Sequence, residues 1–491
     1  TNKALVINPL GPIVEQIAGS DDPLDGLRGN LPKELYIGDL LEVLEAAAED
    51  PRIKNILLSL DNIDGTGQAV LYDVGMALQN FKDAGKQIIA VGDSYSRSGY
   101  YLASFADEII MNTDGAIVMD GFGRSRLFFR SFLDRIKVDF NIFRVGTFKS
   151  AVEPYLGDEM SDSAKEANLA YLNVLWSSYK EVISKNRGMT SVEIQYLVDN
   201  ADQILTKENT STSEALLEYG LVDKLLPRTK ARSYLRDLFG ESEDKKSFAR
   251  ISGFEYFQLL QSEKVIKSTN NKIAVIVARG TIVDGVQPPG MIGGDSTSRL
   301  IREAHENEEV KAIVLRVNSP GGSALASEII WREINLAKQK KKVVVSMGNY
   351  AASGGYYIAC NADKIFANIS TLTGSIGVFG IIPNVQKLYK NKLGITIDTV
   401  NTNRSADMGI NRPMTDFERN KIQKNVENIY NTFITHVSEG RNMSKTAVDE
   451  IGQGRVWAGY DAKSIGLIDC YGGLEKAIKI ASELANINEY R

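Results

Sequence analysis

The chain has 491 residues, of which 43% are hydrophobic and 24% are charged, and its formal net charge is −5. This length allows two or three domains with a sizeable core each, and the balance of residues excludes an intrinsically disordered chain. The mildly acidic charge gives no support for nucleic-acid binding, which would favour a basic face, so we expect no nucleic-acid partner.

The sequence has only two histidines, His305 and His436, and two cysteines, Cys360 and Cys470. So few ligands do not favour a zinc site, and we expect neither a metal nor a cofactor. We expect both histidines to be structural, which leaves a Ser-His-Asp triad without its base. Two cysteines cannot build a disulfide framework, and whether they pair with each other stays open.

No stretch reaches the 18 apolar residues that a membrane-spanning helix needs. The sequence starts at Thr1 rather than Met, which is consistent with the removal of an N-terminal piece. A membrane anchor outside these residues therefore stays compatible with the sequence.

Short β-branched runs alternate with helical segments along the chain, and the second half repeats the first. Residues 54–61 match residues 311–318 at an offset of 257. In the second half, residues 313–317 and 343–347 are too short and too rich in Val and Ile for helices, whereas residues 326–338 carry apolar side chains at helical spacing. This order predicts βαβ units and a mainly parallel sheet.

The repeat divides the chain into two copies of one α/β domain. We expect the first copy to cover residues 1–240 and the second to cover residues 271–491. The charged stretch Gly240-Glu-Ser-Glu-Asp-Lys-Lys-Ser begins the predicted linker, which covers residues 241–270.

One segment of the second copy carries a candidate nucleophile that its counterpart has lost. The segment is Asn349-Tyr-Ala-Ala-Ser-Gly-Gly-Tyr-Tyr-Ile-Ala, and the first half contains Asp93-Ser-Tyr-Ser-Arg-Ser-Gly-Tyr-Tyr-Leu-Ala. Pairing the tyrosines at an offset of 256 puts Arg97 opposite Ser353. The first copy therefore contains a degenerate serine site, in which the serine has been replaced.

A second pair of segments shows the opposite loss. Val145-Gly-Thr-Phe-Lys-Ser-Ala matches Val400-Asn-Thr-Asn-Arg-Ser-Ala, so that Lys149 lies opposite Arg404 at an offset of 255. One half has kept a serine and the other has kept a lysine. We interpret this as a single Ser/Lys pair divided between two copies.

The turns around Ser353 have the residues that acyl transfer requires. Ser353 lies between a predicted strand and a predicted helix, where the N–H of Gly354 could stabilise a forming oxyanion. The turn Asn318-Ser-Pro-Gly-Gly-Ser follows the preceding strand and can point further N–H groups outward. Whether Gly321 or Gly322 is the second donor stays open.

Lys149 can serve as the base only if its surroundings lower its pKa. Neutralising a lysine with a pKa of about 10.4 at pH 7 costs roughly 4.6 kcal/mol, so the side chain must be desolvated. Arg404 cannot take this role because a guanidinium stays protonated.

Five motifs together resemble the signal peptide peptidase A (protease IV) family in its double-length form. The motifs are Asn318-Ser-Pro-Gly-Gly-Ser, Ala351-Ala-Ser-Gly-Gly-Tyr, Thr373-Gly-Ser-Ile-Gly, Phe148-Lys-Ser-Ala and Gly454-Arg-Val-Trp-Ala-Gly. The resemblance implies tandem domains of the Clp/crotonase-like α/β fold. It also implies a role for each matched residue: Ser353 as nucleophile, Lys149 as general base, Ser375 as the hydroxyl that orients the lysine, and Gly354 and Gly321 as the oxyanion hole.

The same resemblance implies a serine endopeptidase that degrades signal peptides already released from preproteins, and other extended apolar peptides. It implies an N-terminal membrane anchor that these residues lack, a homotetramer, and a place on the periplasmic side of the bacterial inner membrane. Two alternatives remain: a crotonase-like acyl-CoA enzyme, which needs no Ser/Lys pair, and a catalytically inactive scaffold of the same fold.

Overall fold

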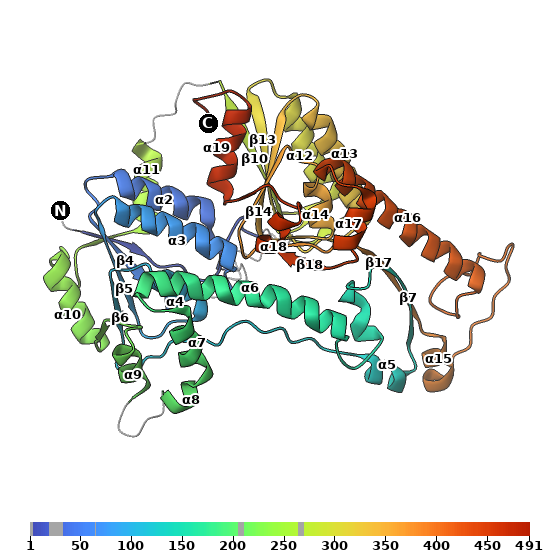
Figure 1. Ribbon diagram of the computed structural model, residues 1–491, viewed down its shortest axis with the longest axis horizontal. Coiled ribbons are helices and arrows are strands. Elements are labelled where there is room, and N and C mark those ends of the chain that lie inside the picture. The colour runs from blue at the N-terminus through green and yellow to red at the C-terminus, as the bar shows by residue number, and fades with distance from the viewer. Residues whose placement is uncertain (1–2, 19–32, 64, 205–210, 264–269) are drawn as a thin grey trace.

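The computed structural model describes residues 3–18, 33–63, 65–204, 211–263 and 270–491 of the protein. Two halves lie side by side, the first coloured blue to green and the second yellow to red (Figure 1). Each half is built on a parallel β-sheet with helices packed against it. The α/β class and the mainly parallel sheets predicted from the sequence are thereby confirmed.

The sheet of the first half has six strands in the order β8-β6-β5-β4-β1-β9, and all its pairs are parallel. The strands are β1 (Ala4–Ile7), β4 (Asn55–Ser59), β5 (Gln87–Gly92), β6 (Glu108–Met111), β8 (Lys224–Leu225) and β9 (Arg250–Ser252). Two short strands, β2 (Ile13–Val14) and β3 (Leu35–Tyr36), pair beside it.

The sheet of the second half repeats this order as β19-β15-β14-β13-β10, again with parallel pairs. Its strands are β10 (Lys272–Arg279), β13 (Val310–Ser319), β14 (Lys342–Ala352), β15 (Lys364–Ala367) and β19 (Cys470–Tyr471). Strand β16 (Leu372–Gly374) adds to β14 in parallel, and β18 (Val456–Ala458) adds to β16 in antiparallel orientation. Strands β11 (Ile282–Val283) and β12 (Ile292–Gly293) form a separate pair.

The helices of the first half are α2 (Ile37–Glu49), α3 (Gln68–Asp83), α4 (Arg97–Ala103), α5 (Arg130–Ile136), η1 (Ser150–Tyr155), α6 (Asp162–Arg187), α7 (Ser191–Asp199), α8 (Ala201–Ile204), α9 (Thr212–Glu218), α10 (Arg228–Phe239) and α11 (Gly253–Glu263). Those of the second half are α12 (Gly294–Glu306), α13 (Ala324–Lys338), α14 (Gly354–Ala359), α15 (Gln386–Leu388), η2 (Tyr389–Leu393), α16 (Asp416–Arg441), α17 (Lys445–Ile451), α18 (Gly459–Ser464) and α19 (Leu474–Leu484). Among the described residues, none of these helices combines the length and the apolar composition that crossing a bilayer requires.

The two halves also repeat individual tertiary contacts. In the first half the hydroxyl of Tyr100 donates to the carbonyl oxygen of Leu221 at 2.8 Å. In the second half the hydroxyl of Tyr356 donates to that of Leu467 at 2.9 Å. The tyrosines are the pair that aligns the two sequences, so the sequence offset of 256 corresponds to equivalent positions in space.

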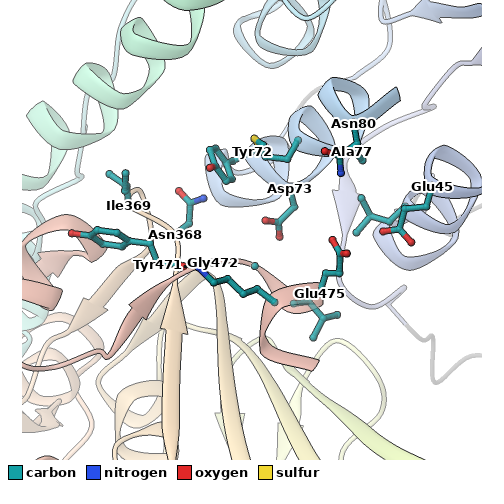
Figure 2. Close-up of a pocket in the computed structure, with 15 residues that line it drawn as sticks. Glu45, Tyr72, Asp73, Ala77, Asn80, Asn368, Ile369, Tyr471, Gly472 and Glu475 are labelled. Carbon is teal, nitrogen blue, oxygen red and sulfur yellow. Dashed lines mark hydrogen bonds between the residues drawn. The ribbon is translucent and has the colours of Figure 1, made fainter. Parts of the chain in front are cut away.

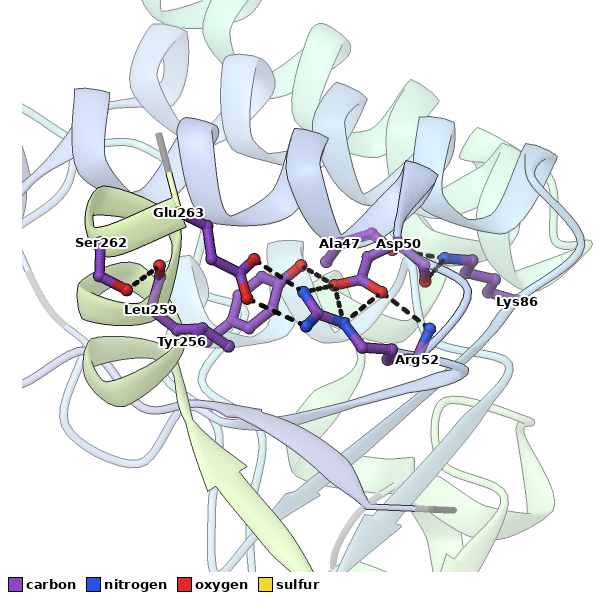
Figure 3. Close-up of polar contacts among 8 residues, drawn as sticks. All are labelled: Ala47, Asp50, Arg52, Lys86, Tyr256, Leu259, Ser262 and Glu263. Carbon is purple, nitrogen blue, oxygen red and sulfur yellow. Dashed lines mark hydrogen bonds and ion pairs between the residues drawn. The ribbon is translucent and has the colours of Figure 1, made fainter. Parts of the chain in front are cut away.

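The predicted linker over residues 241–270 needs correction, because part of it folds onto the first half. Strand β9 extends the first sheet beside β1, and α11 packs on α2. Figure 3 shows the polar contacts that hold this helix: Tyr256 donates to Asp50 at 2.9 Å, and Arg52 bridges Asp50 and Glu263. The charged residues before β9 obscured these elements in the sequence, and residues 264–269 lie outside the described residues.

One antiparallel strand pair joins the two halves. Strand β7 (Asp139–Val145) leaves the first half and pairs along its whole length with β17 (Val378–Asn384) of the second. In Figure 1 this pair lies far from the first sheet, at the end of the arm that also carries α5. This pairing therefore places the residues that follow β7, including Lys149, next to the second half.

A buried ion cluster also ties the halves together. Arg316 on β13 is 1% exposed, and its guanidinium lies 3.1 Å from Glu15 and 3.5 Å from Asp73, both from the first half. Asp73 points into a pocket between the halves, where Glu45 and Glu475 also lie (Figure 2). One guanidinium therefore faces two carboxylates, and the closer and more deeply buried of them belongs to Glu15.

We expect Asp73→Asn to stabilise the protein at alkaline pH. Burial raises the pKa of Asp73 to about 6, against the attraction of Arg316. A carboxyl whose pKa is higher in the folded state than in the unfolded state contributes stability below the unfolded value of about 4, and that contribution is lost as pH rises through 6. The gain of the variant should therefore grow with pH, up to about 3 kcal/mol at pH 8.

Thermal unfolding midpoints of the two proteins at pH 5 and pH 8 measure this effect. A variant that is less stable than the native protein at pH 8 would mean that the contact between Asp73 and Arg316 outweighs the cost of burying the carboxylate.

Candidate active site

Ser353 lies between the end of β14 and the start of α14, in a backbone conformation that L-residues rarely adopt. Its φ is 55° and its ψ is −119°, and its N–H donates to Gly374 O at 2.8 Å. Such strain persists only where the surrounding structure imposes it, and it is concentrated at functional sites. A serine held at a sharp turn from strand to helix is typical of an exposed nucleophile.

Lys149 approaches this serine from the first half. The N–H of Phe148 donates to Gln453 O at 2.8 Å, which fixes the segment after β7 against the second half. Lys149 Nζ lies 3.0 Å from Ser353 Oγ, 3.0 Å from Ser375 Oγ and 2.9 Å from Ser375 O. The structure thus brings together the serine, the lysine and the orienting hydroxyl named from the sequence.

The lysine is buried without a carboxylate partner. Its residue is 4% exposed, and no ion pair joins it to an acidic side chain within the described part of the chain. A methyl group on Gly377 would lie 3.2 Å from Lys149 Cδ, and one on Gly454 would lie 2.6 Å from Lys149 N, so both glycines permit this close packing. Burial lowers the pKa of Lys149 to about 8.

The two glycine turns predicted to form the oxyanion hole also meet at Ser353. A methyl group on Gly321 would lie 2.7 Å from Gly354 N and 2.8 Å from Ser353 Cβ. As the first residue of α14, Gly354 has an N–H without a partner inside its helix. The N–H of Gly321 donates to Ser319 Oγ at 3.1 Å, whereas Gly322 N would lie 3.2 Å from a methyl group on Gly354.

The counterparts of the serine and the lysine lie outside this site. Arg404 is exposed, with its guanidinium 3.6 Å from the centre of the Phe417 ring. Arg97 begins α4 in the first half and stacks on Phe122.

The histidines and cysteines also lie away from the reacting atoms. His305 contacts Glu333 at 3.1 Å and His436 contacts Glu328 at 2.9 Å, which agrees with structural roles for both. Cys360 and Cys470 are free thiols, so the pairing left open by the sequence is absent between these two residues.

Glu15, a residue of the first half that no sequence motif indicated, supports the site. Asn318, which opens the glycine turn, donates to Glu15 at 2.5 Å and accepts from the N–H of Tyr350 at 3.1 Å. Glu15 therefore links the first half, through Asn318, to the glycine turn and to the last residues of β14 before Ser353. Nothing in the local sequence could have revealed this contact, because 303 residues separate its partners.

A serine at a strained turn, in contact with a desolvated amine, is a geometry that can support nucleophilic catalysis. A family model for peptidase family S49 matches residues 80–239 in the first half and residues 335–488 in the second. The chain belongs to peptidase family S49.

Curated relatives agree with this family and its class of activity. The chain is 39% identical to "Protease 4" of Salmonella typhi over 95% of its own length and 75% of the relative's. It is 40% identical to "Protease 4" of Haemophilus influenzae, over 95% of its length and 76% of the relative's. It is 31% identical to "Serine protease SPPA, chloroplastic" of Arabidopsis thaliana, over 94% and 68%. The protein is accordingly a serine protease of the double-length form.

Among solved structures, a ClpP1 mutant from Listeria monocytogenes is similar over 42% of this chain and 94% of its own. The identity is 14% and the TM-score is 0.29, which is too low to support any comparison of function. Membership of a protease family decides against the crotonase-like acyl-CoA alternative.

Proposed function

We propose that this serine protease uses Ser353 as its nucleophile and Lys149 as its general base. The observation that carries the proposal is the 3.0 Å contact between Lys149 Nζ and Ser353 Oγ, made by a lysine that is buried and has no acidic partner among the described residues. With a pKa of about 8, removing its proton at pH 7 costs about 1.4 kcal/mol, compared with about 4.6 kcal/mol for an ordinary lysine.

The reaction begins when neutral Lys149 accepts the hydroxyl proton of Ser353 while Oγ bonds to the scissile carbonyl carbon. The carbonyl oxygen becomes an oxyanion near the N–H of Gly354 and the turn at Gly321 and Gly322. As the C–N bond breaks, the lysine ammonium returns the proton to the leaving amine. Water then attacks the acyl-enzyme with the same base, which releases the acid and restores Ser353.

Ser375 directs the lone pair of the lysine toward Ser353. When Lys149 is neutral, its two remaining N–H bonds can point to Ser375 O and Ser375 Oγ, at 2.9 and 3.0 Å. The lone pair is then left for the third neighbour of Nζ, which is Ser353 Oγ. This geometry supports the orienting role of Ser375.

We expect Ser375→Ala to lower kcat by up to about 100-fold with little change in KM, because a misdirected base costs rate without weakening substrate binding. Steady-state kinetics on a peptide ester measures both constants. Ser482→Ala removes another buried serine hydroxyl, on α19, and should change neither constant. A rise in KM with an unchanged kcat for Ser375→Ala would contradict the orienting role.

Extended apolar peptides fit the surface beside Ser353. The N–H of Ile282 donates to Gly321 O, and Ile282 O accepts from the N–H of Ser323. The N–H and C=O of Gly322, which lies between these two partners, therefore point away from Ile282. A substrate strand can add to this opposite edge. Leu325 is 62% exposed and Phe379 is 41% exposed, and both follow turns that meet at Ser353. Exposed apolar side chains at a binding edge favour apolar partners.

We therefore assign released signal peptides as the substrate class, since a signal peptide is an apolar core followed by small residues. A relative from Enterococcus faecium, 40% identical over 43% of this chain, is named "Putative signal peptide peptidase SppA", which supports this assignment. By the same resemblance, the enzyme works as a homotetramer at the periplasmic side of the bacterial inner membrane.

Digestion of a synthetic signal peptide, followed by mass spectrometry, tests the substrate class. We expect cleavage inside the apolar core and near the small residues, and none with the Ser353→Ala variant. A peptide of equal length in which the apolar core is replaced by Lys and Glu is the control. Cleavage of the control at the same rate, or mainly after charged residues, would rule out this substrate class.

A further inference from the structure

The first half has a cavity of about 530 Å³ at its degenerate serine site. The turn at Thr66 and the start of α4 at Arg97 line it from the first half, and Tyr350 lines it from the second. Neither Ser353 nor Lys149 is among the described residues that line it. The cavity is therefore a separate site from the one proposed for catalysis.

Three residues that line the cavity align in sequence with residues at or near Ser353. The equivalent pairs, at offsets of 256 or 257, are Thr66 and Ser323, Arg97 and Ser353, and Phe122 and Phe379. A short strand borders the turn in both halves: the N–H of Ile13 donates to Thr66 Oγ1 at 2.9 Å, and the N–H of Ser323 donates to Ile282 O at 2.8 Å. The first copy thus has an arginine in place of the serine and has a cavity beside that position.

A cation occupies the position of the lost nucleophile. The guanidinium of Arg97 lies 4.2 Å from the centre of the Phe122 ring and 3.6 Å from Asp120, whose side chain is mostly exposed. Arg124 lines the same cavity. The described lining contains these two arginines and no carboxylate, so the cavity is suited to an anionic group.

The wall of the cavity includes Gln68, a buried side chain with one acceptor that no described residue satisfies. Gln68 is 9% exposed, and its Nε2 donates to Ser178 Oγ at 2.6 Å, while the hydroxyl of Ser178 donates onward to Leu175 O at 3.1 Å. Gln68 Oε1 is left without a hydrogen-bond partner within the described chain. This unpaired acceptor is costly to the fold, and because its surface is closed to solvent it belongs to the wall of the cavity and offers no contact to a ligand.

We propose that this cavity binds the C-terminal residue of a peptide, with its carboxylate on Arg97 and an apolar side chain against Phe122. In a working copy the serine oxygen faces the carbonyl carbon of the residue held in the groove. An arginine at that position faces the same carbon as a free carboxylate, which a guanidinium binds through two parallel hydrogen bonds. Each cleavage of an apolar peptide creates such an end, so the choice of ligand class rests on the proposed function.

Fluorescence anisotropy with the Ser353→Ala protein tests the proposal, because it measures binding without turnover. The probe is a labelled apolar pentapeptide with a free C-terminal carboxylate, compared with the same peptide carrying a C-terminal amide. We expect the acid to bind at least about tenfold more tightly than the amide. Arg97→Gln should remove this difference, and Arg97→Lys, which keeps the charge, should retain part of it.

Two controls separate this site from others. Arg404→Gln removes an exposed arginine elsewhere and should leave the preference for the acid unchanged. Thermal unfolding checks that the Arg97 variants remain folded. Equal affinities for acid and amide when Arg97 is intact would overturn the proposal, as would a preference that survives Arg97→Gln. Because this binding requires no hydrolysis, a failed peptidase assay would count against the proposed function and leave this result standing.

Discussion

Ser353→Ala should lower peptide hydrolysis by at least about 10⁴-fold while the protein stays folded. The oxygen that this change removes is the only atom expected to bond to the substrate carbonyl, and losing a nucleophile has effects of this size in other serine proteases. The fold should tolerate the change because the β14–α14 turn is held by backbone bonds, such as that from the N–H of Ser353 to Gly374 O.

Hydrolysis of an apolar peptide ester, together with the thermal unfolding midpoint, measures both parts of this expectation. Ser98→Ala removes the serine next to Arg97 in the degenerate serine site of the first half, and it should leave the rate almost unchanged. A fluorophosphonate probe should label the native protein at Ser353 and not the variant. Activity of Ser353→Ala within tenfold of the native enzyme would exclude Ser353 as nucleophile, and a native protein without activity would identify an inactive scaffold.

Lys149→Arg should be nearly as damaging as Lys149→Ala, with rates at least about 10³-fold below those of the native enzyme. Arginine keeps the positive charge, but it cannot lose a proton in the working range, so it cannot accept one from Ser353. Lys149→Met is a matched control for packing, because it keeps an unbranched chain in the buried position. Substantial activity in the arginine variant would reduce the lysine to an electrostatic or structural role.

The pH dependence of the native enzyme follows from the same group. Burial lowers the pKa of Lys149 to about 8, and the active form is the neutral amine. The rate should therefore increase about tenfold per pH unit below 8 and level off above it, with roughly a tenth of the maximum at pH 7. A profile of kcat/KM that is flat between pH 6 and pH 9 would contradict Lys149 as the titrating base.

The sequence alone was enough to predict the duplicated α/β architecture and the candidate pair of Ser353 and Lys149. Both predictions rest on patterns that can be read from the sequence without the fold. The first is the alternation of short β-branched runs with helical segments. The second is a pair of repeated segments, of which one copy lacks the serine and the other lacks the lysine. Position in the alignment could identify Lys149 without knowledge of its surroundings. The expectation that this lysine is desolvated came from the lowered pKa that a general base needs near neutral pH.

The tertiary structure alone decided how the two residues meet. Lys149 reaches Ser353 because β7 pairs with β17 across the halves, and because Gly377 and Gly454 leave room for the lysine stem. Such contacts depend on complementary shape between segments more than 200 residues apart, which no local pattern encodes.

The same reason explains the other differences between prediction and structure. Strand β9 joins the first sheet through backbone hydrogen bonds to β1, which depend on register and not on side-chain type, so a charged stretch concealed it. Glu15 supports the turn at Asn318 through a contact that exists only when the two halves are packed together. Local sequence determined the chemistry available to this protein, and long-range packing determined which residues could carry it out.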